Sequence, residues 1–259
     1  MPVESELSPD GIRTITLNRP PANAIHYDVM EELIEAFDHA DDDWNTRVVI
    51  LQSKNEKFFS GGWDVKAKAP DPDTLPPAVP QFGSYRGREV FRAMYQCGAP
   101  VIAKIDGIAV GAGFLYACLA DFVVASENAQ FGQFEIKVDA VGGCGIVRRM
   151  MSEQAMRYLT WTAKLVSARK LSELGAGIHV VPRAELDDEV AELAQLLASR
   201  SSVVTRHTKA AMNQVERLGP LEAYTFEQMH SQIISQAGAD NNLAGVRGGG
   251  AKLGENSEM

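Results

Sequence analysis

Two short segments of the chain combine residue types that can stabilise negative charge and move a proton. Gly111, Ala112 and Gly113 stand immediately before an apolar helical stretch, and Glu135 stands further along among phenylalanines and an isoleucine. Small residues at a helix N-terminus leave backbone N–H groups open to a ligand. A carboxylate with apolar neighbours is a candidate base, because desolvation raises its pKa. Close packing of the glycines and a salt bridge at Glu135 are the structural alternatives.

A second glycine-rich turn could supply a further backbone donor. Gly61 and Gly62 follow a buried, strand-like run and permit a tight turn that presents the N–H of Trp63. A Gly-Gly pair alone indicates only a turn, but two N–H donors that converge from separate loops form an oxyanion hole. Gly111 also begins a dinucleotide-binding GxGxxG pattern, which fails at Tyr116, where a small residue is required.

The elements expected around these segments alternate in type, as in an α/β protein. Apolar or alternating runs predict strands at 14–17, 47–52, 100–105 and 122–125. Helical spacing of apolar residues predicts helices at 28–37, 84–96 and 112–119, and later at 152–163, 167–174, 186–200 and 202–217. The proline-rich stretch 70–80 indicates a mobile loop, and the end from 248 is expected to be disordered. The turn at 142–145 has little side-chain bulk, so it either leaves room for a flat acyl group or is a plain turn.

The composition narrows the class of protein. The chain has 259 residues and a net charge of −9, which argues against nucleic acid or an anionic membrane as the main partner. Its three cysteines are widely spaced and show no CxxC or metal-binding pattern, so buried thiols in a reducing compartment are expected. The acidic first ten residues do not resemble a signal peptide, and no apolar run is long enough to span a membrane. We therefore expect a cytoplasmic protein without a metal site.

Taken in order, the motifs resemble those of the crotonase superfamily, the enoyl-CoA hydratase/isomerase family, over residues 12–245. The segments that carry the resemblance are 16–20 (TLNRP), 23–25 (NAI), 59–66 (FSGGWDVK), 100–107 (PVIAKIDG), 111–113 (GAG), Asp121 and 129–133 (AQFGQ). The resemblance implies an α/β fold, a spiral of repeated ββα units in residues 1–200 that holds an acyl-CoA site. For residues 201–259 it implies a C-terminal helical region that mediates homotrimers, often paired into hexamers, followed by the disordered tail.

By the same resemblance, the chain binds an acyl-CoA thioester and stabilises its enolate. The two oxyanion donors fall on the N–H groups of Trp63 and Ala112, and one of the two carboxylates of a typical hydratase falls on Glu135. The other falls on Leu115, and Gly143 occupies the place where the family brings backbone close to the attacking water or to a further acid. The coenzyme A channel and acyl site are expected to include Asn23, Ala24, His26, Gly62, Asp64, Val65, Lys66 and Gly111. Coenzyme A enters only as part of the substrate, and no separate cofactor is implied.

The leucine at position 115 favours a reaction that needs one base. Hydration needs one group to hold water and another to deliver a proton, and loss of a positioned acid or base costs roughly 10²–10⁴-fold in rate. A shift of the double bond from 3-enoyl-CoA to 2-enoyl-CoA needs only Glu135 as a proton shuttle. Leu115 would help exclude water from the dienolate. The pattern is closest to that of the Δ3,Δ2-enoyl-CoA isomerases.

Other readings stay open at this point. A hydratase could use Asp139, Asp64, His26 or a residue of the 70–90 segment as its second acid. Related decarboxylases, hydrolases and enzymes that form C–C bonds use the same enolate-stabilising hole with altered acids. A homologue that binds acyl-CoA without turnover would keep the scaffold after losing one acid.

Overall fold

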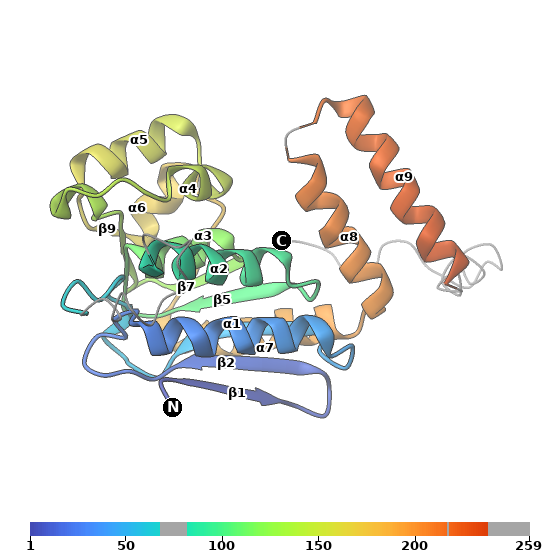
Figure 1. The fold of residues 1–259 in the computed structure, drawn as a ribbon, viewed down its shortest axis with the longest axis horizontal. Coiled ribbons are helices and arrows are strands. Elements are labelled where there is room, and N and C mark those ends of the chain that lie inside the picture. Colours follow the sequence, from blue (N-terminus) through green and yellow to red (C-terminus); the bar gives the residue numbers. More distant parts are fainter. Residues whose placement is uncertain (68–81, 217, 238–259) are drawn as a thin grey trace. The chain divides into compact units, whose positions relative to one another are not determined.

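The computed structural model describes residues 1–67, 82–216 and 218–237. The chain divides into two compact units, Met1–Ser199 and Arg200–Met259. Within the described residues, the first unit holds two β-sheets with the helices packed on them, and the second holds two helices (Figure 1). The loop predicted at 70–80 and the tail predicted to be disordered lie outside the described residues.

The larger sheet of the first unit has six strands in the order β1-β2-β3-β5-β7-β10. Neighbouring strands are parallel, except for β1 and β2. The central strands are rich in valine, isoleucine and alanine and are mostly buried, as is typical of a parallel sheet that is covered on both faces. The strands are β1 (Val3–Leu7), β2 (Ile12–Leu17), β3 (Val48–Ser53), β5 (Val101–Ile105), β7 (Phe122–Ser126) and β10 (His179–Val181).

A ββα unit repeats along the chain and builds a second, smaller sheet. Each of β3, β5 and β7 is followed by a short strand and then by a helix. The short strands are β4 (Phe58–Ser60), β6 (Ile108–Val110) and β8 (Gln130–Gly132), and the helices are α2 (Phe82–Gln96), α3 (Ala112–Leu119) and α4 (Cys144–Met150). The short strands pair in parallel in that order, and β9 (Val166–Ser167) joins β8 in antiparallel orientation. Each repeat therefore adds one strand to the larger sheet and one to the smaller sheet, which confirms the predicted α/β spiral of ββα units.

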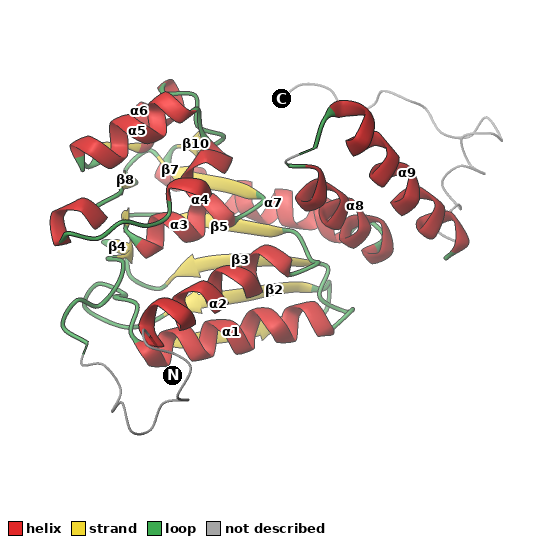
Figure 2. Ribbon diagram, turned by 45° about the horizontal axis from the view of Figure 1, so that its top comes forward, coloured by secondary structure: helices red, strands yellow, loops and turns green. Residues whose placement is uncertain are grey.

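Helices cover both faces of the six-stranded sheet (Figure 2). On one face, α1 (Tyr27–Asp42), α2 and α3 bury their apolar residues in the main hydrophobic core. On the other face, α7 (Leu186–Ala198) forms a second core with residues of β3, β5, β7 and β10. Helices thus cover both faces of the central strands, whereas the short strands lead into the segments that carry the predicted site residues.

The remaining helical segments follow the third repeat. They are the 3₁₀ turn η2 (Glu135–Val138), α5 (Glu153–Thr162), α6 (Ala168–Glu173) and the 3₁₀ turn η3 (Arg183–Glu185). Both α5 and α6 begin after a serine whose hydroxyl accepts a hydrogen bond from a backbone N–H of the first turn. In the second unit, α8 (Ser202–Val215) packs against α9 (Pro220–Gln236).

The predicted strands and helices that lie in the described residues are all present, with small shifts at their ends. The sequence-based prediction omits the first strand, the short strands β4, β6, β8, β9 and β10, the 3₁₀ turns η2 and η3, and the helices α4 and α9. Strands of two or three residues are too short to show alternation of polar and apolar residues. The structure buries none of the residues of α9, so this helix has no apolar face turned toward a core that the spacing of its residues could reveal.

Candidate active site

Three segments that carry predicted site residues leave neighbouring strands of the smaller sheet. Gly62 and Trp63 follow β4, Gly111 and Ala112 follow β6, and Glu135 follows β8. Because β4, β6 and β8 are parallel neighbours, their carboxyl ends lie side by side, about 4.8 Å from one strand to the next. The region beyond the carboxyl ends of parallel strands is where α/β proteins place ligands. The fold therefore collects these residues at one edge.

The turn after β4 leaves the N–H of Trp63 open. Gly62 has a φ of +80°, which favours glycine, and its N–H donates to the hydroxyl of buried Ser60 at 3.2 Å. In the bridge between Ile25 and Trp63, Ile25 makes both hydrogen bonds, to the carbonyl of Gly62 and from the N–H of Asp64. The N–H of Trp63 therefore faces away from Ile25, and it donates to no acceptor within the described part of the chain.

The N-terminus of α3 presents a second backbone donor. Gly111, with a φ of +53°, precedes the helix, and its N–H donates to the carbonyl of Gly132 at 3.0 Å. Ala112 is the first helical residue, so its N–H has no intrahelical acceptor, and none of the described residues accepts from it. Gly113 has to lack a side chain, because a Cβ there would lie 2.6 Å from the Cβ of Ser60.

The two donor loops touch each other. A Cβ on Gly62 would lie 2.8 Å from the carbonyl oxygen of Val110 and 3.3 Å from the nitrogen of Ala112. A Cβ on Gly111 would lie 3.5 Å from the Cα of Gly62. The open N–H groups of Trp63 and Ala112 thus belong to adjoining segments. Two such donors can stabilise an oxygen on which negative charge develops.

Glu135 begins η2 and carries a partly desolvated carboxylate. Its Oε1 lies beside Gly111, 3.8 Å from the place of a Cβ there, and its Oε2 is buried without a hydrogen-bond partner among the described residues. Burial raises the pKa of Glu135, while hydrogen bonds from the backbone of Glu135 and Phe134 offset part of that effect. The salt bridge considered as an alternative does not occur with any described residue. A carboxylate with one buried, unpartnered oxygen beside two open donors can act as a general base.

Leu115 lies one turn into α3 and forms an apolar wall of the site. It is 5% exposed, and its N–H donates to the carbonyl of Gly111. Its side chain packs on Gly143, where an added Cβ would lie 2.4 Å from Cδ2 of the leucine. Gly143 also has a φ of +76° and precedes α4. The loop and the leucine therefore fit each other closely and place no acid at this contact.

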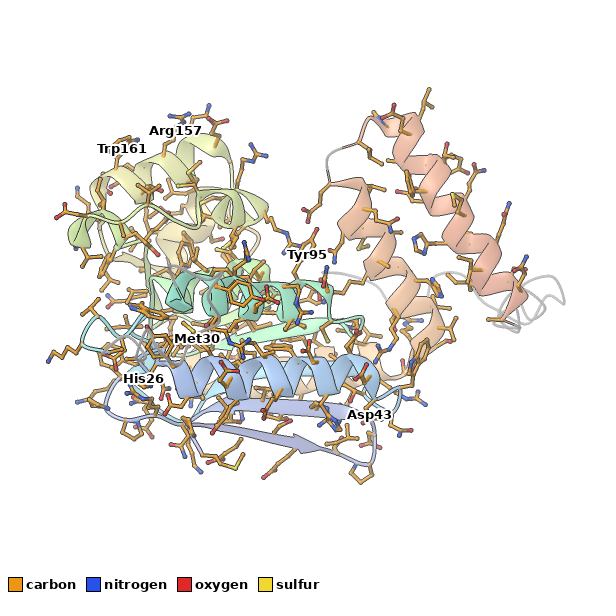
Figure 3. All side chains as sticks on the ribbon, viewed as in Figure 1. His26, Met30, Asp43, Tyr95, Arg157 and Trp161 are labelled. Carbon is orange, nitrogen blue, oxygen red and sulfur yellow. The ribbon has the colours of Figure 1, made fainter. Side chains whose placement is uncertain are left out.

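The residues considered by name as a second acid in place of Leu115 are either exposed or paired with another side chain. Asp139 is exposed, has a φ of +53° and lies past the end of η2, so it does not share a helical face with Glu135. The carboxylate of Asp64 forms an ion pair with Arg19 at 3.0 Å. His26, labelled in Figure 3, directly precedes α1, and its Nδ1 lies 2.9 Å from Oδ1 of Asp28 in the first turn of that helix. The 70–81 part of the segment expected to offer another acid lies outside the described residues.

The residues predicted to line the coenzyme A channel fall into two groups. Val65 and Lys66 are exposed, and Ala24 and His26 are partly exposed, so all four can meet a ligand. Asn23 is 1% exposed, and its amide donates to hydroxyl and carbonyl oxygens of β3 and β4. Its Oδ1 accepts from the backbone N–H of Arg19 at 2.7 Å. We therefore assign the side chain of Asn23 to the turn rather than to the channel.

Three polar residues that sequence reasoning did not single out organise these loops. Arg19 donates from Nη1 to the carbonyl of Ala24 and from Nη2 to Asp64, so it holds both sides of the bridge at Trp63. Ser60 anchors Gly62, and Gln133 is buried directly after β8. In the sequence, each of them is only recognisable as a polar residue within one of the motifs of the family resemblance. Such a position does not by itself distinguish a structural role from a functional one.

Two further expectations concern metals and thiols. Among the residues that the structure describes, no group of three or more His, Cys, Asp and Glu side chains could hold a metal ion. Cys97 and Cys118 are buried thiols as predicted, whereas Cys144, at the start of α4, is partly exposed. None of the described helices is both long and apolar enough to cross a bilayer.

Comparisons with known proteins agree on one family. The sequence profile described as enoyl-CoA hydratase/isomerase matches residues 8–245. A protein of Rhodococcus jostii named (7aS)-7a-methyl-1,5-dioxo-2,3,5,6,7,7a-hexahydro-1H-indene-carboxyl-CoA hydrolase is 32% identical over 246 residues, which cover 93% of this chain and 92% of the relative. Carnitinyl-CoA dehydratase of Escherichia coli K12 is 34% identical over 222 residues, with 83% and 82% covered. The crystal structure of an enoyl-CoA hydratase from Bacillus anthracis shares the fold, with a TM-score of 0.85, 24% identity, and 99% of this chain and 100% of that chain covered.

Proposed function

The chain belongs to the enoyl-CoA hydratase/isomerase family, and on that premise we propose that it shifts the double bond of a 3-enoyl-CoA thioester to give the 2-enoyl-CoA thioester. The observation that carries the proposal is the combination at the strand ends. The carboxylate of Glu135, whose Oε2 is buried without a hydrogen-bond partner among the described residues, lies beside two open backbone donors. Leu115 stands where a typical hydratase would have its other acid.

In the proposed reaction the thioester carbonyl oxygen accepts hydrogen bonds from the N–H groups of Trp63 and Ala112. The carboxylate of Glu135 removes a proton from C2, and the electrons of that C–H bond form the enolate, whose charge rests on the carbonyl oxygen. The same carboxyl group then returns the proton to C4 while the double bond moves to C2–C3. One proton has moved from C2 to C4, and no water has been consumed.

The electrostatics of Glu135 suit a group that takes and returns a proton. A carboxylate at its ordinary pKa is a weak base, and burial makes this one a stronger base by raising its pKa. Leu115 and the backbone of Gly143 form an apolar contact next to the donor loop, which supports exclusion of water from the dienolate.

The names of two relatives favour a second candidate, a reaction in which water is added or removed at the same enolate site. One relative is named a hydrolase and the other a dehydratase, and both share about a third of their residues with this chain. Such a reaction would require a further group to handle water. Asp64 and His26, two of the residues considered for that task, each have a hydrogen-bonded partner.

A paired assay of the purified protein separates the two candidates. One arm follows formation of the conjugated product from 3-hexenoyl-CoA, and the other follows hydration of crotonyl-CoA. We expect isomerisation to exceed hydration by orders of magnitude. Dominant hydration would show that another acid acts in the site, and absence of both reactions would reject the proposal.

The base is tested by Glu135→Gln, which keeps the shape of the side chain and removes its ability to accept a proton. We expect isomerisation to fall by roughly 10²–10⁴-fold, the usual contribution of a general base. Binding of butyryl-CoA, measured by calorimetry, should be retained because the two N–H donors are unchanged. Isomerisation that survives the substitution would show that another group is the base.

A further inference from the structure

Gln133 is a deeply buried polar side chain that links two walls of the candidate site. We propose that Gln133 and Thr160 form a positioning bridge that holds the Gly142–Gly143 loop in place relative to Glu135. The inference rests on the proposed function, because it takes Glu135 as the base. It adds two positioning residues, one of them on α5, a helix that contributes none of the predicted site residues.

The hydrogen bonds of Gln133 are specific at both ends of its amide. The side chain is 1% exposed, its Nε2 donates to the carbonyl of Gly142 at 2.9 Å, and its Oε1 accepts from the hydroxyl of Thr160 at 2.7 Å. The hydroxyl of Thr160 also lies 2.9 Å from the carbonyl oxygen and 3.7 Å from the sulfur of Met156, so its one hydrogen is shared among these acceptors. The opposite orientation of the amide would set its oxygen against the carbonyl of Gly142. The network therefore selects one orientation of Gln133.

The bridge spans a loop that core packing does not hold. Residues 136–141, between Glu135 and the Gly142–Gly143 loop, are all exposed, and Val141 is 98% exposed. Their backbone hydrogen bonds run within the loop, from Lys137 to Phe134 and from Ala140 to Glu135. Gln133 instead connects the start of this segment directly to its end. Its loss would leave both ends of the loop less well fixed.

The bridge joins the segment of the proposed base to the loop that packs on the apolar wall of the candidate site. Gln133 lies two residues before Glu135, and Gly142 adjoins Gly143, which packs on Leu115. A change at Gln133 would therefore alter the spacing between the base and the apolar wall while leaving the donors of Trp63 and Ala112 in place. Small displacements of this kind cost up to about 10²-fold in rate.

Two substitutions test the bridge in different degrees. Gln133→Met keeps the length of the side chain and removes both hydrogen bonds, whereas Thr160→Val removes only the hydroxyl. Thr46→Val is the matched control, because Thr46 is fully buried and accepts a hydrogen bond from Arg13, but lies just before β3. The measurements are kcat and KM with 3-hexenoyl-CoA, hydration of crotonyl-CoA, and amide hydrogen exchange of residues 139–147.

We expect Gln133→Met to lower kcat by roughly tenfold to 10²-fold, to raise the ratio of hydration to isomerisation several-fold, and to speed exchange in 139–147, since the base is displaced and a loosened wall admits water. Thr160→Val should show the same changes in smaller measure, and it keeps the test open if Gln133→Met does not fold. Thr46→Val should lower Tm without changing the kinetics or the exchange of residues 139–147.

If the wild-type chain isomerises and Gln133→Met changes only Tm, the bridge is merely structural and the inference is overturned. If the wild-type chain does not isomerise, the proposed function fails, and unchanged exchange in Gln133→Met would overturn the bridge separately.

Discussion

At the residue scale, the carboxylate of Glu135 loses water on folding and gains no hydrogen bond at Oε2 from the described residues. Its pKa in the folded protein is therefore raised above the ordinary glutamate value of 4.5. A base with a raised pKa keeps its proton to a higher pH. We expect kcat/KM for isomerisation to fall on the acid side with a midpoint above pH 4.5, as measured in a pH–rate profile.

The same shift predicts how stability depends on pH. A group with a raised folded pKa contributes stability that is fully present below its unfolded pKa and is lost as pH rises through the folded value. Removing the charge with Glu135→Gln should therefore raise Tm at pH 7 to 8, and the gain should shrink as pH approaches 4.5. Thermal unfolding at a series of pH values measures this difference.

Glu153→Gln is the control for that experiment. Glu153 is exposed, and its hydrogen bond to Arg157 lowers the pKa of its carboxyl, opposite to the effect at Glu135. This variant should show no gain in Tm at neutral pH. A gain of equal size in both variants would mean that net charge, rather than burial of Glu135, sets the effect.

Leu115 supplies a second prediction at the same scale. Leu115→Glu places a carboxylate one helical turn beyond Gly111, where it can hold water. We expect hydration of crotonyl-CoA to rise at least about tenfold, part of the 10²–10⁴-fold typical of a positioned acid or base. Leu115→Gln, which is polar but cannot exchange a proton at neutral pH, should gain far less. Equal hydration by both variants would show that polarity alone is limiting.

At the element scale, the site depends on the close contact of two loops. A Cβ at Gly62 would meet the backbone of Val110 and Ala112, and its φ of +80° strains any other residue. We expect Gly62→Ala to lower the free energy of unfolding by about 1–3 kcal/mol and to abolish most isomerisation. Gly145→Ala is the matched control, because an added Cβ there meets nothing within 4 Å. Urea unfolding and the isomerase assay should separate the two variants, and equal losses would contradict this account of the contact.

Sequence analysis predicts the long elements and the segments that meet at the candidate site, because the signals are local. The apolar runs that form β3 and β5 and the glycine pattern before α3 are visible in a few consecutive residues. The contact between Leu115 and Gly143 and the bonds of Gln133 join distant residues, and no local pattern encodes them. The position of Asp139 could not be predicted either, because the sequence does not reveal that a short 3₁₀ turn ends there with a positive φ.

At the scale of the whole molecule, α9 exposes apolar residues that a helix in water would ordinarily cover. Exposed side chains include Leu221, Tyr224, Met229 and Ile233, and the structure buries no residue of α9. Large exposed apolar surfaces mark sites of association. We expect sedimentation velocity to give a particle of three or six chains, in line with the trimers implied by the family resemblance. The double variant Leu221→Asp/Ile233→Asp should shift it toward the monomer, and a wild-type monomer would contradict the expectation.

The pairing of β4, β6 and β8 has a consequence for how this enzyme family can diverge. The loops of the proposed donors and the segment of the proposed base leave strands that are hydrogen-bonded to one another, so their mutual positions are inherited with the sheet. Leu115 and Gly143 lie beyond those strands, on α3 and before α4. After a gene duplication, substitutions at these two positions could therefore change which atom receives the proton in the proposed reaction while the geometry of the proposed donors is passed on unchanged. A lineage can in this way acquire a new reaction without first losing the old fold.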